Sequence, residues 1–174
     1  SGAKEASETK TALLGEEPVT IVFWHCASDE SGVLMDKFID TFNKENPYKI
    51  TVKGIYQGQY SDATTLMKTI ISAENYSELP DVMQMDATGK VDYFSSGRAL
   101  TASDAFASHG DISSSYIPVA LSNWEYQGVV LGLPFDLSTT ITFYNKDMLE
   151  AAGWDKAPET FQDIIDLKRD MEKA

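Results

Sequence analysis

Polar and aromatic side chains gather at three places along the chain, each at the end of a stretch that has the pattern of a β-strand. They comprise hydroxyls, amides, one carboxylate and aromatic rings: Trp24, His25, Cys26, Ser28, Tyr56, Gln57, Gln59, Tyr60, Asp86 and Thr88. Such groups exchange hydrogen bonds with hydroxyl groups, and the rings stack on the apolar face of a sugar. One tyrosine or glutamine in a loop is usually only solvated, so the repetition at three sites is what indicates binding.

The elements that must position these residues are three strands and the helices between them. Val19–His25 is apolar almost throughout, as a strand buried on both faces should be, and Lys49–Tyr56 and Asp81–Asp86 follow as further strands. Apolar residues recur at helical spacing from Leu34 to Phe42 and again from Ala63 to Ile71, where we expect Ser61 to cap the helix. A short helix is predicted from Thr88 to Ser96, ending at Gly97.

This alternation of strand and helix predicts an α/β fold, with a mostly parallel sheet flanked by helices and right-handed crossovers. The three strands should be mutually parallel in one sheet. In such sheets ligands bind beyond the carboxyl ends of the strands. Trp24, Tyr60 and Asp86 should therefore lie around one concave surface, with Tyr60 more exposed than a core tyrosine.

The second half of the chain is less regular. Thr101–Asn123 is predicted to be helical, with Pro118 disturbing the helix, and a hairpin is expected around Gln127-Gly128. Thr140–Asn145 is predicted to be a strand. Asn145 is placed as the cap of a helix that ends at Gly153.

A last amphipathic helix is predicted to begin at the capping box formed by Thr160 and Asp163. It continues to the end of the chain without a stop signal, which indicates a truncated sequence. The phenylalanines Phe23, Phe38, Phe42 and Phe161 are assigned to the core. If the chain is truncated, however, the last helix should expose Phe161, Ile164 and Ile165.

Charge and composition exclude several classes of partner. The 174 residues include 27 acidic and 14 basic side chains, giving a net charge of −13, which repels nucleic acid and anionic lipid. Residues 1–17 are small and polar and are interpreted as a flexible tether. Any attachment to a membrane would use a lipid anchor that is not present in this chain. Cys26 is the only cysteine, so no internal disulfide can form.

Motifs for catalysis or cofactor binding are absent. The sequence has no G-x-x-x-x-G-K-[ST], G-x-G-x-x-G or G-x-S-x-G motif, and its two histidines, His25 and His109, lack the spacing of metal ligands. We therefore expect neither enzymatic activity nor a cofactor. The alternative is a flavodoxin-like or receiver-like domain in redox chemistry or signalling. Asp86 would suit a phospho-acceptor, but the acidic pair of receivers is missing after the first strand.

An ordered set of short segments resembles family 1 extracellular solute-binding proteins, which include maltose-type and glycerol-3-phosphate-type binding components of ABC importers. The segments span nearly the whole chain from Val19 onward: Val22–His25, Phe42–Pro47, Ile55–Tyr60, Leu133–Thr139, Phe143–Asp147, Leu149–Gly153 and Pro158–Phe161. In the glycerol-3-phosphate group, residues that match Tyr60 and Ser138 contact ligand. A glutamate of that group is replaced by Ala87, which leaves sugars or oligosaccharides equally open.

The resemblance implies a two-lobed extracytoplasmic protein, either a cell-surface lipoprotein or periplasmic, that passes a sugar or polyol to permease subunits. It divides the chain into a tether (1–17), an amino-terminal ligand-binding lobe (18–135), and a crossover segment with the truncated start of a second lobe (136–174). We expect the ligand contacts to be Trp24, His25, Tyr60, Asp86 and Ser138.

Overall fold

The computed structural model describes residues 17–173. The chain forms two compact units, one that ends at Phe135 and one that begins at Asp136. The proposed tether, residues 1–17, lies outside the described residues except for Glu17.

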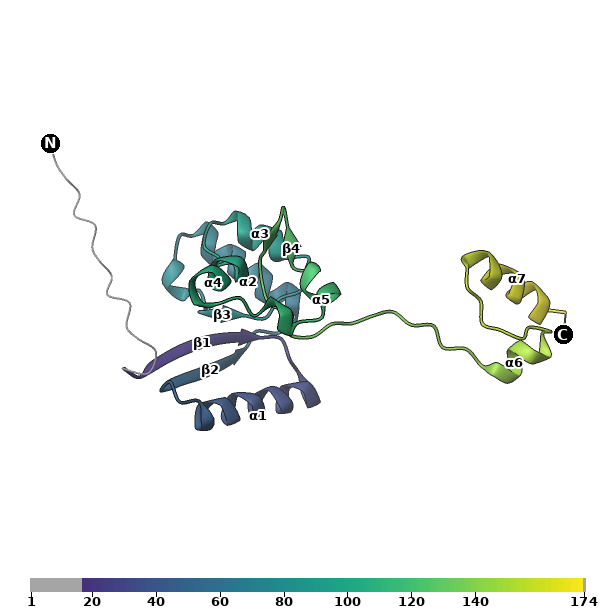
Figure 1. The fold of residues 1–174 in the computed structure, drawn as a ribbon, viewed down its shortest axis with the longest axis horizontal. Helices are drawn as coiled ribbons and strands as arrows, with labels where there is room; N and C mark the ends of the chain where they lie inside the picture. The colour runs from purple at the N-terminus through teal and green to yellow at the C-terminus, as the bar shows by residue number, and fades with distance from the viewer. Residues whose placement is uncertain (1–16, 174) are drawn as a thin grey trace. The chain divides into compact units, whose positions relative to one another are not determined.

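A parallel sheet of β2–β1–β3 organises the first unit (Figure 1). Strands β1 (Val19–His25) and β2 (Ile50–Tyr56) pair along their whole length, and β3 (Val82–Met83) pairs with β1 on its other side. The prediction of three mutually parallel strands is confirmed. β3 is shorter than the predicted Asp81–Asp86, because the chain turns into a side-chain-stabilised loop after Gln84.

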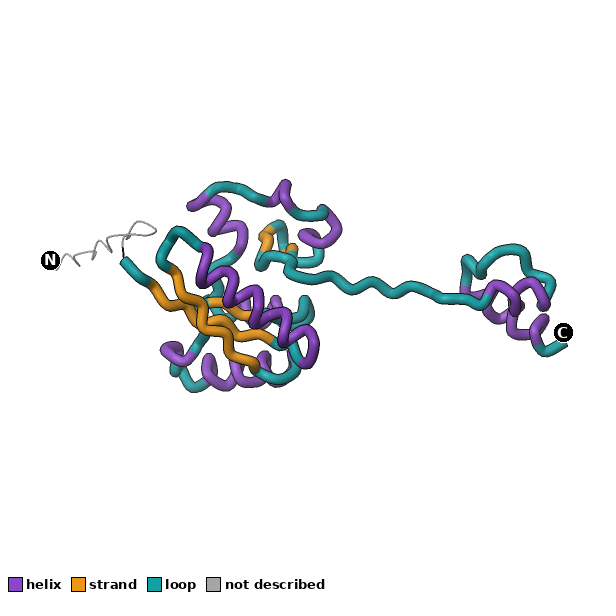
Figure 2. Tube along the Cα trace, turned by 90° about the horizontal axis from the view of Figure 1, so that it is seen from below, coloured by secondary structure: helices purple, strands orange, loops and turns teal. Residues whose placement is uncertain are grey.

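Helices cover both faces of this sheet (Figures 1 and 2). Helix α1 (Asp29–Glu45) lies on one face, and α2 (Tyr60–Ser72) lies on the other. A 3-10 turn, η1 (Tyr76–Glu78), follows α2, and α3 (Lys90–Ser95) follows β3. The α2 cap differs from the prediction: Gln59 occupies the N-cap position, and Ser61 is already inside the helix.

The hydrophobic core lies between the sheet and α2. Trp24, Met67 and Ile70 are buried there, and a shell of half-buried side chains surrounds them: Val22, Ile55, Ile71, Leu79, Met83, Met85 and Tyr93. Because side chains alternate along a strand, Trp24 faces this core while its neighbours Phe23 and His25 face α1. The α2 stripe predicted from the sequence is thus the principal core-forming helix face.

The α1 face is packed more sparsely. Met35 is the only buried residue of helix α1, whereas Phe38 and Phe42 are 52% and 41% exposed. The assignment of these two phenylalanines to the core was wrong, because no described element covers that side of α1. Phe23, on the strand beneath, was also assigned to the core and is only partly buried.

Residues 101–123 do not form the single predicted helix. They form α4 (Ala102–His109), a 3-10 turn η2 (Ser113–Ser115) and α5 (Pro118–Ser122). Gly110, with φ of 103°, ends α4, and Pro118 occupies the first turn of α5, where its missing N–H costs nothing. Proline therefore starts a new helix here instead of disturbing a continuous one.

The predicted hairpin is present. Strands β4 (Glu125–Tyr126) and β5 (Val129–Val130) pair antiparallel around Gln127 and Gly128, which have φ of 51° and 78°. Two consecutive positive φ angles are those of the type I′ turn that suits two-residue hairpins.

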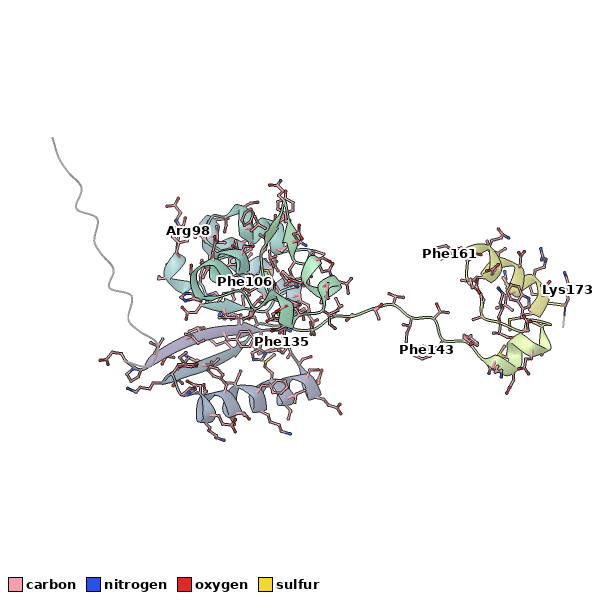
Figure 3. All side chains as sticks on the ribbon, in the orientation of Figure 1. Arg98, Phe106, Phe135, Phe143, Phe161 and Lys173 are labelled. Carbon is pink, nitrogen blue, oxygen red and sulfur yellow. The ribbon has the colours of Figure 1, made fainter. Side chains whose placement is uncertain are left out.

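The second unit contains α6 (Lys146–Ala151) and α7 (Phe161–Met171). Both predicted caps are confirmed: Asn145 accepts a hydrogen bond from the Met148 N–H, and Thr160 and Asp163 form a capping box. The predicted strand Thr140–Asn145 is wrong, because an extended segment becomes a strand only when it has a partner, and none of the described residues pairs with it. Phe161 (Figure 3) is 89% exposed, so its assignment to the core was also wrong.

Candidate functional site

The carboxyl edge of the sheet brings together three chain segments that are far apart in sequence. β1 and β2 end opposite each other at His25 and Tyr56, and the chain beyond β3 passes beside them. The Cys26 N–H donates to Gln84 Oε1 at 2.9 Å, and Gln84 Nε2 donates to the Tyr60 hydroxyl at 3.1 Å. One side chain therefore joins the segments that follow the three strands.

Gln84 was not among the residues predicted for this site. The sequence interpretation placed it inside the strand Asp81–Asp86, whereas it stands one residue beyond β3. Its own N–H still donates to the Trp24 carbonyl at 2.8 Å, so it extends the strand pairing by one step while its side chain reaches across the edge. The sequence did contain one indication of this role, because Gln84 is a long amide side chain directly after a short apolar strand.

Tyr60 is the first residue of α2 and is partly exposed. The start of that helix is fixed by Asp62, whose carboxylate accepts the Gln59 N–H at 2.9 Å. A carboxylate in the first turn also interacts favourably with the positive end of the helix dipole. The tyrosine ring thus projects from a rigid helix start and reaches the centre of the edge.

Asp86 stabilises the turn that leads to α3. Its Oδ1 atom accepts hydrogen bonds from the Thr88 hydroxyl at 2.6 Å, the Thr88 N–H at 3.0 Å and the Gly89 N–H at 3.1 Å. These bonds, the Thr88 hydroxyl first among them, lower the pKa of Asp86 although partial burial opposes them. Asp86 is therefore ionised at neutral pH and oriented by its own loop.

Cys26 occupies the centre of the same edge, half-buried. Its Sγ lies 3.9 Å from the Gln84 carbonyl oxygen. Burial raises the pKa of the thiol, and the negative charges of Asp62 and Asp86 raise it further. The thiol therefore stays protonated at neutral pH, in contrast with the lowered pKa that activates a nucleophilic cysteine.

Trp24 and His25 are both buried, at 5% exposure each. Trp24 is part of the core cluster on the α2 side. His25 lies on the α1 side between the rings of Phe23 and Tyr56, with centroid distances of 5.8 and 6.0 Å, and its Nδ1 has no hydrogen-bond partner among the described residues. Both side chains have packing roles here, and contact with a ligand stays a prediction for each.

A hollow adjoins the strand ends on the α1 side. It is lined by the His25 and Tyr56 rings and by residues of the β1–α1 connection, α1 and β2: Ala27, Ser28, Asp29, Gly32, Asp36 and Gly54. Gly54 contributes no side chain there, and a Cβ at this position would lie 2.5 Å from Ile39 Cδ1 and 3.6 Å from the His25 ring. The hollow offers the Ser28 hydroxyl, two carboxylates and two aromatic rings.

Ser138 belongs to the second unit, where it is exposed in a segment without regular secondary structure. Its membership of the site stays a prediction. Within residues 17–173 there is no cluster of three or more histidine, cysteine or acidic side chains arranged to hold a metal ion. No helix in that range is both long and apolar enough to cross a membrane.

Residues 27–174 match the family model of the bacterial extracellular solute-binding proteins. The match covers most of the chain, and the protein belongs to this family. The α/β fold and the mostly parallel sheet agree with this membership.

Curated relatives include the sn-glycerol-3-phosphate-binding periplasmic proteins UgpB. The protein from Shigella flexneri is 31% identical over 94% of this chain, and that from Escherichia coli K12 is 31% identical over 89%. The chain spans 38% and 36% of the lengths of these relatives.

Solved structures show the same fold. The sugar-binding protein MalE from Xanthomonas citri has a TM-score of 0.70 at 22% identity, and the match covers 88% of this chain and 38% of MalE. UgpB from Mycobacterium tuberculosis, solved with glycerophosphocholine, has a TM-score of 0.69 at 24% identity, covering 91% of this chain and 41% of UgpB.

Proposed function

We propose that this chain forms the amino-terminal part of a substrate-binding component of an ABC importer. It binds a sugar or polyol, with sn-glycerol-3-phosphate among the candidates, in a cleft between two lobes, and it performs no catalysis. Residues 18–135 form the first lobe, and residues 136–174 form the crossover and the start of the second. Ligand contacts come from Tyr60 and Asp86, with Trp24, His25 and Ser138 as further contacts.

The observation that carries this proposal is the polar edge of the sheet. Tyr60, Gln84 and Asp86 hold a hydroxyl, an amide and a carboxylate in fixed positions where parallel sheets bind ligands. These groups pair with ligand hydroxyls without chemical activation, and the high pKa of the Cys26 thiol gives no support for a nucleophile. Membership of the solute-binding family supports the same role.

The partners follow from the family. A substrate-binding component acts outside the cytoplasm, at the cell surface or in the periplasm, and delivers its ligand to permease subunits. Contact with a membrane would be through the permease or through a lipid anchor outside this chain. The net charge of −13 disfavours nucleic acid as a partner.

The signalling and redox alternative has no support in the geometry. In a receiver-like domain Asp86 would accept a phosphoryl group with help from neighbouring acids and Mg²⁺. Here its Oδ1 atom already accepts three hydrogen bonds from Thr88 and Gly89.

The test is a titration of the ¹⁵N-labelled 174-residue chain, followed by NMR, with sn-glycerol-3-phosphate, glycerophosphocholine and maltose as probes. Because the chain spans 38% of the UgpB length, we expect it to supply only part of the contacts. Half of the roughly 8 kcal/mol of a micromolar complex leaves an affinity of about 1 mM. We expect at least one probe to shift the amide signals of Cys26, Tyr60, Gln84 and Asp86.

The matched control is a second tyrosine. Tyr60→Phe should weaken binding, whereas Tyr48→Phe, at a tyrosine that is 47% exposed, should leave it unchanged. Intact Escherichia coli UgpB serves as the positive control for sn-glycerol-3-phosphate. The proposal is overturned if no probe shifts the edge signals, or if both tyrosine variants bind as the parent chain does.

A further inference from the structure

We propose that Asn43 and Asn46 close the outer edge of strand β2, so that a second copy of this chain cannot add to the sheet there. The outer edge is the side of β2 that faces away from β1. The inference concerns an interaction surface at the start of β2, away from the candidate ligand contacts, and it does not depend on the proposed function.

The position of β2 in the sheet creates the need for such a closure. Among the described residues only β1 pairs with β2, so β2 is an edge strand, and the unpaired backbone groups of an edge can receive a strand of another molecule. In a parallel ladder alternate residues turn their N–H and C=O groups toward the neighbouring strand. The Lys49 carbonyl accepts the Val19 N–H at 3.1 Å, so the odd-numbered residues face β1. The even-numbered residues of β2 therefore turn their backbone groups outward: Ile50, Val52, Gly54 and Tyr56.

Two asparagine side chains already occupy the first half of these outward groups. Asn43 Oδ1 accepts the Val52 N–H at 2.7 Å, and Asn43 Nδ2 donates to the Val52 carbonyl at 3.0 Å. Asn46 does the same at Ile50, accepting its N–H at 3.1 Å and donating to its carbonyl at 2.9 Å. A carboxamide carries the same acceptor and donor as a peptide group, so each asparagine takes the place of one residue of a neighbouring strand.

Helix α1 holds both asparagines opposite β2. Asn43 lies in the last turn of the helix and Asn46 is its C-cap, and both are half-buried. Asn46 Nδ2 also donates to the Phe42 carbonyl at 2.8 Å, and its Oδ1 atom accepts the Tyr48 N–H at 3.2 Å. An approaching strand would have to break these bonds and leave half-buried amides without partners, which is unfavourable.

The two remaining outward positions, Gly54 and Tyr56, lie beside negative charge. Both line the hollow on the α1 side, together with Asp29 and Asp36. A strand that added here would bring its carbonyl oxygens close to two carboxylates, and charged side chains at an edge deter strand addition. These two positions also form a shorter stretch than strands usually pair over. The asparagines thus close the part of the edge that a second strand could otherwise use.

The decisive variant combines Asn43→Ala with Asn46→Ala, which frees the outward groups of Val52 and Ile50. Sedimentation velocity of the 174-residue chain at rising protein concentration measures its self-association. We expect the association constant of this alanine variant to be about tenfold or more above that of the parent chain, because hydrogen bonds now form between the edges of two copies.

The matched control combines Asn43→Asp with Asn46→Asp. The two carboxylates still accept the Val52 and Ile50 N–H groups but no longer donate, so hydrogen bonds are lost while the edge stays occupied. Met67→Ala is a second control, because it destabilises the core on the α2 side and leaves the outer edge intact. Both controls should associate like the parent chain. If the alanine variant does not fold, Asn43→Ala alone, which frees only Val52, replaces it.

Amide hydrogen exchange shows where the copies meet. In the alanine variant the Ile50 and Val52 amides should exchange faster than in the parent chain at low concentration and become protected again at high concentration. The Gln57 amide, which donates to the His25 carbonyl at 3.0 Å, should stay protected at both. If the asparagines only fasten α1 to the sheet, the faster exchange will not depend on concentration.

Any of three results overturns the inference. Unchanged association of the alanine variant would mean that the opened edge does not pair. Equal gains in the alanine and aspartate variants would mean that lost stability drives the association. Protection that rises with concentration outside β2 would place the contact on another surface. None of these results bears on the proposed function, which is tested by ligand titration of Tyr60→Phe.

Discussion

Helices α1 and α2 flank the same sheet, yet only one of them forms a core. Both carry apolar residues at helical spacing. On α2 the residues Met67 and Ile70 are 0% and 5% exposed, whereas on α1 Leu34 and Phe38 are 50% and 52% exposed. The comparison shows that apolar residues at helical spacing are buried only where another element covers them. Packing against the sheet buries Ala63, Met67 and Ile70 of α2 but only Met35 of α1.

The difference also separates the two sides of the candidate site. Tyr60 projects from α2, whose packing against the core holds it in place. The hollow on the α1 side is bordered by a helix with one buried residue, Met35. We expect the α2 side to be the more rigid half of the site, because local stability follows the density of buried apolar contacts.

The largest expected effect tests the comparison directly. Met67→Ala should destabilise the first unit by about 2–5 kcal/mol, because it leaves a cavity in a filled core. Leu34→Ala removes a similar volume from α1 and should cost less than about 1 kcal/mol, since half of that side chain already contacts water. Urea unfolding followed by tryptophan fluorescence measures both. Equal losses would contradict the asymmetry of the two faces.

The next largest loss of stability is expected from a substitution at Gly54, on the α1 side of the sheet. A Cβ at Gly54 would lie 2.5 Å from Ile39 Cδ1, so Gly54→Ala must displace that methyl group and should cost about 1–2 kcal/mol. Adding Ile39→Val deletes the methyl group and should recover part of the loss. The double-variant cycle in urea provides the measurement. Without any recovery, the α1 side would be looser than the structure shows.

A smaller effect distinguishes helices held by packing from helices held by caps. Thr160→Ala removes the hydroxyl that accepts the Asp163 N–H at 3.1 Å, and should destabilise α7 by about 1 kcal/mol. Ser61→Ala, inside the first turn of α2, should be close to neutral because Gln59 is the cap. Amide hydrogen exchange in each helix reports the result. A large loss in Ser61→Ala would restore the cap predicted from the sequence.

The smallest effect is the pH dependence of the turn at Asp86. Since the pKa of Asp86 in the fold is lowered, its contribution is complete above the unfolded value of about 3.9 and is lost as the pH falls toward the folded pKa. Exposure to solvent keeps the contribution below about 1 kcal/mol. Between pH 5 and 3, Asp86→Asn should lose stability less steeply than the parent chain. If stability falls with pH equally steeply in both proteins, groups other than Asp86 cause the acid sensitivity.

Much of the fold could be predicted from the sequence because its signals are local. The apolar run Val19–His25, the stripe around Met67, the Gln127-Gly128 turn and the Thr160 capping box each specify an element through their own dihedral angles, periodicity or hydrogen bonds. The alternation of strand and helix then leaves the parallel sheet as the consistent arrangement.

Only the tertiary structure decided which apolar or extended segments are covered by, or paired with, another part of the chain. The extended segment Thr140–Asn145 and the exposed Phe38 have the right local pattern but no covering element among the described residues. Gln84 shows the converse: its role depends on Cys26 and Tyr60, which lie 58 and 24 residues away in the sequence. Periodicity carries information over a few residues, whereas burial and shared hydrogen bonds arise only when distant segments meet.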